Sequence, residues 1–283
     1  MGNSPHRPRL PDLNARCGDS DFAFVPGRRL LTCVRDDPSM LQAMHDNREV
    51  CAFHHPEFGT LPTAIDLRQS FSFDVYDQGE LGSCTANALA AAYRFDAVNN
   101  SFAPSRLFIY YNERARENTV QTDAGASLLD GIASLKRVGV CDETIWPYDI
   151  DRFADRPSDE AYQAAQPHKS VLARHQPPTV EGVKKTLLLG YPVVFAVDIF
   201  RGIDDAEDTG RVPMPLPNEA SIGGHALLAV GYNDATQSVI FRNSWGCAWG
   251  DRGHGYLPYA YFAKYAHSVW VIQKTTDDAA DYF

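Results

Sequence analysis

Small and apolar residues recur at helical spacing directly after a glycine-rich loop in the first half of the chain. The loop reads DQGELGSC and ends at Cys84. Beyond it, five positions share one face of a helix with a 3.6-residue repeat, before Asn99 and Asn100 end the run: Ala86, Leu89, Ala90, Tyr93 and Ala97. The pattern predicts a helix that begins at Cys84.

Capping residues combined with apolar spacing predict two further helices. In SLLDGIASLKRVG, Ser127 stands at the N-cap position, Asp130 follows three residues later, and Gly139 is a typical C-terminal stop. Thr179 stands at the N-cap of a third helix, which ends at Gly190. The first half of the chain is therefore predicted to be mainly helical.

The second half is dominated by runs rich in valine, isoleucine and aromatic residues, which favour strands. Asn233 and Asp234 lie in the turn between two of these runs. Residues 151–178 are polar and interrupted by prolines, and they read as the connection between the halves. We predict an α+β chain of two subdomains, with strands at 192–200, 225–232, 238–242 and 268–273.

The first 60 residues differ in texture from the rest, because no helical or strand period persists there. We interpret residues 1–60 as an N-terminal extension that packs on the main domain; an unpacked tail is the alternative. The main domain then covers residues 61–283, with a mainly helical half at 61–175 and a mainly β half at 176–283.

Charge and composition exclude some classes of function. The formal net charge is −10 and no long basic run occurs, which argues against nucleic acid as a partner. No window holds the ~18 apolar residues that span a membrane, and the first residues lack the apolar stretch of a secretory signal. We expect no membrane association and a cytoplasmic location by default; secretion by another route and the oligomeric state stay open.

Six cysteines occur, and none forms a CxxC pair, so we expect no metal site. If one cysteine is a working thiol, five remain, and a complete disulfide framework is not implied. The pairing among these five stays open: Cys17, Cys33, Cys51, Cys141 and Cys247.

Cys84 is the candidate nucleophile because it stands at the start of a predicted helix. Only the thiolate is a good nucleophile, and a helix N-terminus favours the anion through its partial positive charge and free N–H groups. Gln78 carries a neutral amide that can donate to a developing oxyanion, a contribution of about 3 kcal/mol per donor. The alternative for Cys84 is a buried structural cysteine.

A histidine and an amide complete the candidate chemistry. His225, in IGGHALLAVGY, lies at the mouth of a strand behind two glycines that clear space. Asn243 follows the next strand and can accept from a ring N–H, while Trp245 is large enough to screen that bond from water. One turn joins the two strands, so both side chains can reach the same end of the sheet. His254 and His267 are weaker candidates.

These segments together resemble the papain family of cysteine peptidases. The family pairs a catalytic cysteine with histidine and asparagine about 130–150 residues downstream; His225 falls within that range and Asn243 slightly beyond it. The resemblance extends over about residues 61–273 and is most similar to bacterial members. Five motifs occur in the family's order: LPTAIDLRQ, DQGELGSC, GVCDETIWPY, GGHALLAVGY and NSWGCAWGDRGHGY.

The resemblance implies a papain-like α+β fold, in which a helical half and a β half flank an active-site cleft. It implies a role for each candidate residue. These are Cys84 as nucleophile, His225 as general acid/base, Asn243 as the group that orients the imidazole, Gln78 in the oxyanion hole, Trp245 in support, and Gly125 and Gly224 in substrate binding.

The chain departs from the family pattern at two positions. Leu81 stands where relatives carry a cysteine, so the disulfide of that loop is expected to be absent. Thr85 replaces the usual tryptophan or tyrosine, which is expected to loosen the packing beside the nucleophile.

The implied reaction is hydrolysis of peptide bonds in protein or peptide substrates through a thioester acyl-enzyme, without a metal or organic cofactor. Residues 1–60 are expected to act as a pro-segment over the cleft, as in a zymogen. Two other functions stay open: acyl transfer by the same pair, as in a transglutaminase or amidase, and a permanently masked, non-catalytic binding protein.

Overall fold

The computed structural model describes residues 30–96, 101–169 and 171–274. A single mixed sheet runs through the molecule in the strand order β1-β3-β8-β4-β5-β6-β7, with β2 paired to β5. The strands are β1 (Cys51–Ala52), β2 (Ala64–Asp66), β3 (Val171–Gln176), β4 (Val193–Ile199), β5 (Gly223–Asn233), β6 (Ser238–Arg242), β7 (His254–Pro258) and β8 (Ala266–Lys274). The α+β fold class is confirmed.

The sheet is covered on both faces, which explains why its central strands are apolar throughout. In β4, Phe195 and Val197 join one hydrophobic cluster, whereas Val194 and Ala196 join another. Successive side chains of a strand point to opposite faces, so an uninterrupted apolar run fits a strand that is buried on both sides.

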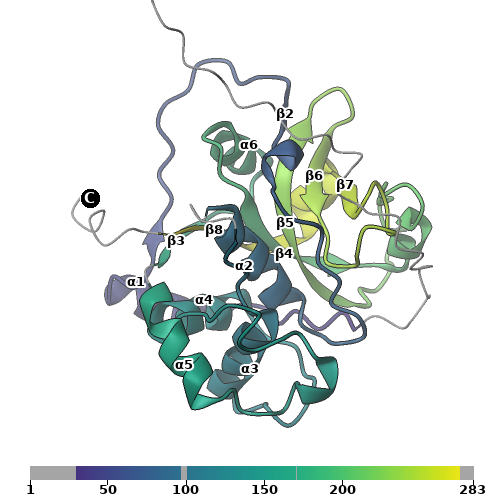
Figure 1. The fold of residues 1–283 in the computed structure, drawn as a ribbon. Helices are drawn as coiled ribbons and strands as arrows, with labels where there is room; N and C mark the ends of the chain where they lie inside the picture. The colour runs from purple at the N-terminus through teal and green to yellow at the C-terminus, as the bar shows by residue number, and fades with distance from the viewer. Residues whose placement is uncertain (1–29, 97–100, 170, 275–283) are drawn as a thin grey trace, which may run out of the picture.

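One face of the sheet carries the helical half. Its helices are α2 (Cys84–Phe95), α3 (Arg106–Glu117), α4 (Leu128–Arg137) and α5 (Asp159–Ala165). Figure 1 shows α3, α4 and α5 grouped at one end of the molecule, with α2 between them and the strands. Every residue of α2 from Cys84 to Tyr93 is buried. Its many alanines allow the helix to approach both the sheet and its neighbouring helices closely.

The opposite face carries α6 (Val180–Leu188) and α7 (Tyr259–Tyr265). Val183 and Leu187 of α6 and Phe262 of α7 pack in the second cluster, where the Phe262 ring meets Phe195 edge to face at 5.1 Å. Short 3-10 turns occupy Arg68–Ser70, Ile150–Arg152, Gln166–His168 and Arg201–Ala206.

The predicted helices and strands are confirmed with small shifts at their ends. Ser127 caps α4 by accepting from the N–H of Asp130 at 3.0 Å, and Thr179 caps α6 by accepting from the N–H of Gly182 at 3.1 Å. The helix that starts at Cys84 ends at Phe95. The predicted end at Ala97 to Asn100 lies outside the described residues.

The reading of residues 151–178 as a plain connection is wrong. This stretch contains α5 and also β3, which pairs antiparallel with β8 along its whole length. The six residues of β3, VLARHQ, alternate between apolar and polar only in part. So short and polar a run does not predict a strand from the sequence.

The extension before residue 61 also contains regular structure. Helix α1 (Pro38–Asp46) is capped by Asp37, whose carboxylate accepts from the N–H of Ser39 at 2.8 Å. The short β1 pairs parallel with β3 and so joins the central sheet. Met44 and Val50 are buried in the cluster shared with α2, so the described part of the extension packs on the main domain.

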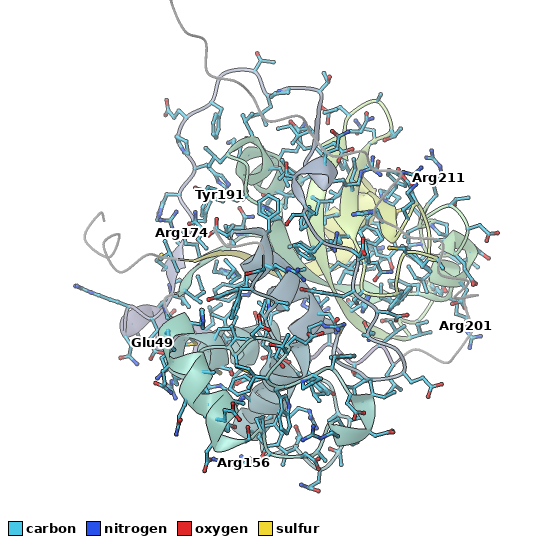
Figure 2. All side chains as sticks on the ribbon, in the orientation of Figure 1. Glu49, Arg156, Arg174, Tyr191, Arg201 and Arg211 are labelled. Atoms are coloured by element: carbon cyan, nitrogen blue, oxygen red, sulfur yellow. The ribbon has the colours of Figure 1, made fainter. Side chains whose placement is uncertain are left out.

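Charged side chains lie mainly at the outside of the molecule, as the labelled Arg156, Arg201 and Arg211 show in Figure 2. Among the described residues, no helix has both the length and the apolar character needed to cross a bilayer.

The double-sided sheet makes the interior sensitive to side-chain truncation. Phe195→Ala should lower the free energy of unfolding by about 3–5 kcal/mol, because it leaves a cavity against Phe262. Urea unfolding measures this change. The matched control is Leu216→Ala, since Leu216 is 74% exposed and its loss should cost less than about 0.5 kcal/mol. A cost below about 1 kcal/mol for Phe195→Ala would contradict the proposed core.

Candidate active site

Cys84 is the first residue of α2 and is completely buried. The N-cap residue, Ser83, does not use its hydroxyl to cap the helix; that oxygen instead bonds with the Tyr148 hydroxyl at 2.5 Å and accepts from the Asn87 amide at 3.0 Å. The positive end of the helix dipole is therefore left to act on the Cys84 sulfur.

His225 and Asn243 meet at one end of the sheet, as predicted. His225 lies near the start of β5, and Asn243 directly follows β6. Nε2 of His225 is 2.9 Å from Oδ1 of Asn243, and both side chains are buried. Oδ1 also accepts from the N–H of Ser244 at 2.9 Å, which fixes the orientation of the amide. The pair therefore holds the ring in one tautomer, with the proton on Nε2.

Trp245 covers this hydrogen bond. Its ring stacks on the His225 ring, with centroids 4.8 Å apart and an interplanar angle of 26°, and it meets Trp249 at a right angle. The tryptophan is 5% exposed, so it keeps water away from the His225–Asn243 contact. The predicted role of Trp245 as a screen fits this position.

The sulfur of Cys84 lies in a field that favours its anion. The Cys84 pKa lies well below its ordinary value: the neighbouring Cys33 side chain lowers it most, followed by the His225 ring and the backbone of Ala226, while burial opposes the shift. The Cys33 pKa is raised well above its ordinary value, chiefly by the Cys84 side chain and then by burial. Of the two thiols, Cys84 is therefore the one whose anion the surroundings favour.

Gln78 also lies at the site. It is completely buried, and its Oε1 accepts from the Ser244 hydroxyl at 2.6 Å, while Nε2 donates to the carbonyl of Leu81 at 2.9 Å. A side-chain amide has two N–H donors, so one remains for another acceptor. The backbone of Gln78 donates to Ser244 at 2.9 Å, which ties the loop before Cys84 to the segment that carries Asn243.

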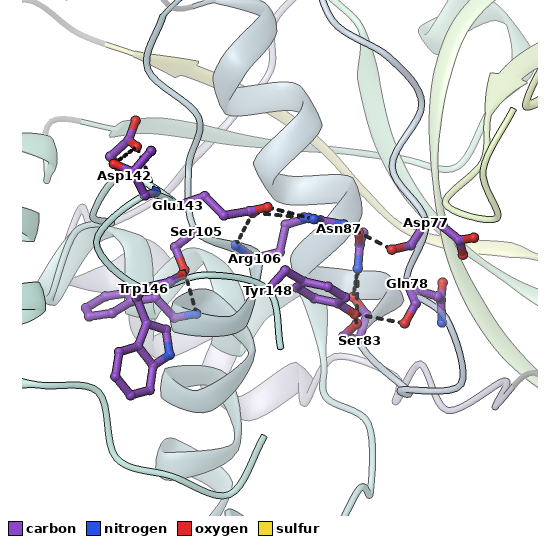
Figure 3. Close-up of polar contacts among 12 residues, drawn as sticks. Asp77, Gln78, Ser83, Asn87, Ser105, Arg106, Asp142, Glu143, Trp146 and Tyr148 are labelled. Carbon is purple, nitrogen blue, oxygen red and sulfur yellow. Dashed lines mark hydrogen bonds and ion pairs between the residues drawn. The ribbon is translucent and has the colours of Figure 1, made fainter. Parts of the chain in front are cut away.

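A buried charged network supports the loop before the nucleophile. Arg106, at the start of α3, donates to both carboxylate oxygens of Glu143, at 2.9 and 2.7 Å, and to the Asp77 carbonyl at 3.1 Å. Its guanidinium lies 3.9 Å from the centre of the Tyr148 ring. Figure 3 shows Arg106 between Glu143 and Asp77, with Tyr148 beside Ser83 and Gln78. The Tyr148 hydroxyl donates to the Gln78 carbonyl at 3.0 Å, so the network binds the backbone of both Asp77 and Gln78, in the loop before Cys84.

The two departures from the family pattern are accommodated within the core. Leu81 is 5% exposed and fills its site. Thr85 is completely buried and donates to Glu113 at 2.8 Å, so the expected loosening beside the nucleophile is not seen. Burial raises the pKa of the Glu113 carboxyl well above its ordinary value.

Residues 31–36 lie against the predicted site. The N–H of Cys33 donates to the Gly224 carbonyl at 3.0 Å, and the N–H of Val34 donates to the Ala126 carbonyl at 3.0 Å. A Cβ added at Gly125, whose φ is +74°, would lie 1.8 Å from the Thr32 carbonyl oxygen. The two glycines predicted to bind substrate are thus in contact with the chain's own N-terminal segment.

The next residues fix this segment to the body of the protein. The Asp36 carboxylate accepts from the N–H of Leu129 at 3.0 Å and from the Trp270 indole at 3.1 Å. Arg35 pairs with Asp198 at 2.6 Å. The segment is therefore held on both the helical and the sheet side of the site.

The structure brings all the predicted site residues together and leaves the weaker candidates apart. Burial lowers the pKa of His254 to about 3 and that of His267 to about 4, and neither bonds to Cys84. Sequence reasoning missed Cys33, Arg106 and Tyr148. Tyr148 is the last residue of the motif GVCDETIWPY, whereas Cys33 and Arg106 carry no local signal, because their partners lie far away in the sequence.

Comparison with known proteins decides the family. The model of the papain family cysteine proteases matches residues 61–267. The chain belongs to the papain family of cysteine proteases. It is therefore a cysteine peptidase, a hydrolase, and the predicted family is confirmed.

One curated protein and one solved structure are similar to this chain over most of its length. An uncharacterized peptidase C1-like protein of Acanthamoeba polyphaga mimivirus is 40% identical, over 87% of this chain and 79% of that protein. The crystal structure of xylellain, a cysteine protease from Xylella fastidiosa, superposes with a TM-score of 0.78 at 34% identity, covering 89% of this chain and all of that one. The expected similarity to bacterial members is confirmed by the second.

More distant curated relatives are longer than this chain. Peptidase 1 of the mite Psoroptes ovis is 26% identical, and the match covers 70% of this chain but 61% of the mite protein.

The charged network makes a testable prediction about stability. Glu143→Gln removes the carboxylate that faces the largely buried Arg106 and should lower the free energy of unfolding by about 1–3 kcal/mol. The control is Asp155→Asn, which breaks the exposed Arg152–Asp155 pair and should cost less than about 0.5 kcal/mol. Equal effects of the two substitutions in urea unfolding would show that the network does not stabilise the loop.

Proposed function

We propose that Cys84 is the nucleophile of this peptidase, His225 its general acid/base, Asn243 the residue that orients the imidazole, and Gln78 part of the oxyanion hole. The observation that carries the proposal is the buried His225–Asn243 hydrogen bond of 2.9 Å, with the His225 ring close enough to the buried Cys84 to lower its pKa. A thiolate at a helix start, next to an oriented imidazole, is the arrangement that activates cysteine for acyl transfer.

The reaction follows from the positions of these groups. The Cys84 sulfur attacks the carbonyl carbon of a peptide bond, and the oxygen takes up the negative charge. The free N–H of the Gln78 amide and the Cys84 backbone N–H stabilise that charge. His225 gives its proton to the amine as the C–N bond breaks, which leaves a thioester on Cys84. The neutral ring then takes a proton from water, and the resulting attack releases the acid and restores the thiolate.

The substrate is an extended protein or peptide segment. Support comes from the N-terminal segment itself, which already bonds through its backbone to Gly224 and Ala126. A backbone that lies there gains hydrogen bonds independent of its side chains, as extended peptides do when they add to an exposed edge. The steps above use only protein groups and water.

Residues 31–36 keep the enzyme latent in this proposal. Their backbone takes the carbonyls of Gly224 and Ala126, and Cys33 presents its thiol, not a carbonyl, to the Cys84 sulfur. A substrate cannot reach Cys84 while the segment stays in place. Activation then requires the segment to leave, by cleavage of the chain or by displacement.

The catalytic assignment predicts graded losses of activity. In a chain that starts at Asp36, Cys84→Ala should abolish hydrolysis of a peptide amide, and His225→Ala should lower kcat by about 10³-fold or more. Asn243→Ala should lower it by about 10- to 100-fold, because the ring keeps its chemistry but loses its orientation. Circular dichroism checks the fold of each variant. Wild-type turnover in Cys84→Ala would remove Cys84 from the mechanism, and equal losses for His225→Ala and Asn243→Ala would contradict the role of Asn243.

Latency predicts a difference between two truncations. A chain that starts at Leu30 keeps the blocking segment and should react with iodoacetamide at Cys84 at least about 100-fold more slowly than a chain that starts at Asp36. The shorter chain lacks Cys33, but the His225 ring and the backbone of Ala226 still lower the Cys84 pKa, so the thiolate persists as the pH falls. Its alkylation rate should therefore drop less than about threefold from pH 8 to pH 6.5, whereas an ordinary thiol loses about tenfold per pH unit.

The control for this pH profile is His225→Ala in the shorter chain, which should bring back the steep loss of rate, because the ring no longer stabilises the anion. Equal alkylation rates for the two truncations would mean that residues 30–35 do not cover the site.

A further inference from the structure

The segment that covers the site is seated by backbone contact, which fixes the position of Cys33. A Cβ added at Gly223 would lie 2.2 Å from the Leu31 carbonyl oxygen, and one added at Gly224 would lie 2.3 Å from that of Cys33. The Thr32 hydroxyl donates to the Gly82 carbonyl at 3.1 Å, on the loop that leads to Cys84. Because these backbone contacts are so close, the position of Cys33 beside Gly224 is fixed.

Two cysteines consequently face each other inside the protein. Cys33 is 8% exposed, Cys84 is fully buried, and both belong to one buried cluster, with the Cys33 N–H bonded to the Gly224 carbonyl next to His225. Both are free thiols, as are the other three described cysteines: Cys51, Cys141 and Cys247. Two thiols in one buried cluster can form a disulfide when their sulfurs approach to about 2.05 Å.

The pair is also chemically asymmetric. Cys84 has the His225 ring and the start of α2 beside it, whereas Cys33 faces the Val34 carbonyl at 3.8 Å and the carboxylates of Asp36 and Glu113, which disfavour its anion. A reactive thiolate next to a second, protonated cysteine is the arrangement found in redox sensors, in which the second cysteine resolves the first oxidation product.

We propose that Cys33 is a resolving cysteine, and that a peroxide converts the Cys33–Cys84 pair to a disulfide that ties the N-terminal segment covalently over the nucleophile. The proposal rests on the proposed function, because it takes Cys84 as the reactive thiolate. The Cys84 thiolate attacks one oxygen of hydrogen peroxide, the O–O bond breaks and hydroxide leaves, so Cys84 becomes a sulfenic acid. The Cys33 sulfur then displaces the sulfenic oxygen, which leaves as water with the Cys33 proton. The peroxide is reduced and two thiols become one disulfide.

The crosslink has two consequences for the enzyme. It protects the nucleophile, since a disulfide is reversible whereas sulfinic and sulfonic acids are not repaired in the same way. It also makes activation depend on reduction: cleavage of the exposed stretch around Glu57 and Thr60 would free the segment from a reduced chain but not from an oxidised one. The substrate of this modification is a peroxide, and its reversal requires a dithiol.

The test uses the full chain, with the Cys33→Ser variant and Cys51→Ser as a matched control at an exposed cysteine. Each protein is treated with hydrogen peroxide, unfolded, alkylated with or without prior dithiothreitol, and digested for mass spectrometry. Wild type and Cys51→Ser should lose about 2 Da, take up two fewer labels, regain both after dithiothreitol, and yield a peptide that joins Cys33 to Cys84. Cys33→Ser should yield no such peptide and should instead gain about 32 Da at Cys84, as a sulfinic acid that dithiothreitol does not reverse.

The proposal is overturned if oxidised wild-type protein carries a sulfinic or sulfonic acid at Cys84 with Cys33 still free, or if Cys84 is joined to a different cysteine. Circular dichroism confirms that Cys33→Ser is folded, and Cys33→Ala provides a second substitution with the same expected outcome. Because the mapping does not depend on turnover, it is separable from the proposed function. The wild-type chain could form the crosslink while the Cys84→Ala variant of the chain that starts at Asp36 still hydrolyses peptides. That result would refute the catalytic assignment and leave the crosslink established.

Discussion

The contact between the Cys84 sulfur and the His225 ring is the interaction on which the rest of the structure depends. The sulfur belongs to the first residue of α2 and the ring to β5, so the contact exists only when the helix is seated on the sheet. The alanine-rich sequence of α2 makes that seating close, because small side chains separate the helix from the strands. A pair placed in this way keeps its geometry only if its surroundings hold both groups still.

The surroundings do so with polar groups that are themselves buried and paired. Asn243 accepts from the backbone N–H of Ser244, and Gln78 accepts from the Ser244 hydroxyl. Arg106 ties the loop before Cys84 to the segment that carries Glu143. A buried polar group without a partner costs free energy, and a paired one fixes a geometry. The interior near the site is thus polar in the places where position matters, and apolar along α2 and the central strands, where close packing supplies the stability.

The same backbone groups serve two purposes. The carbonyls of Gly224 and Ala126 bond to residues 33 and 34 of the N-terminal segment, and in the proposed function they bind an extended substrate. The proposed latency therefore requires no separate inhibitory site, only a segment that occupies the substrate's place with the wrong group facing the sulfur. Cys33 provides that group. Its side chain lowers the Cys84 pKa, and in our proposal it is also the partner for a crosslink when Cys84 is oxidised.

The sequence by itself determined the secondary structure of the main helices and strands, the α+β class and the residues that we propose for the site. Helical spacing and caps were sufficient for α2, α4 and α6, and apolar runs were sufficient for β4, β5, β6 and β8, because these signals are local in the chain. Cys84, His225, Asn243 and Gln78 could be found because each lies in a motif whose residues are consecutive. Only the tertiary structure decided what depends on distant partners. It showed that β3 completes the sheet, that Arg106 and Glu143 brace the nucleophile loop, and that residues 31–36 lie over the site with Cys33 against Cys84. These contacts join residues tens of positions apart, and nothing in a local pattern of polarity encodes which distant surfaces will be brought together when the core packs.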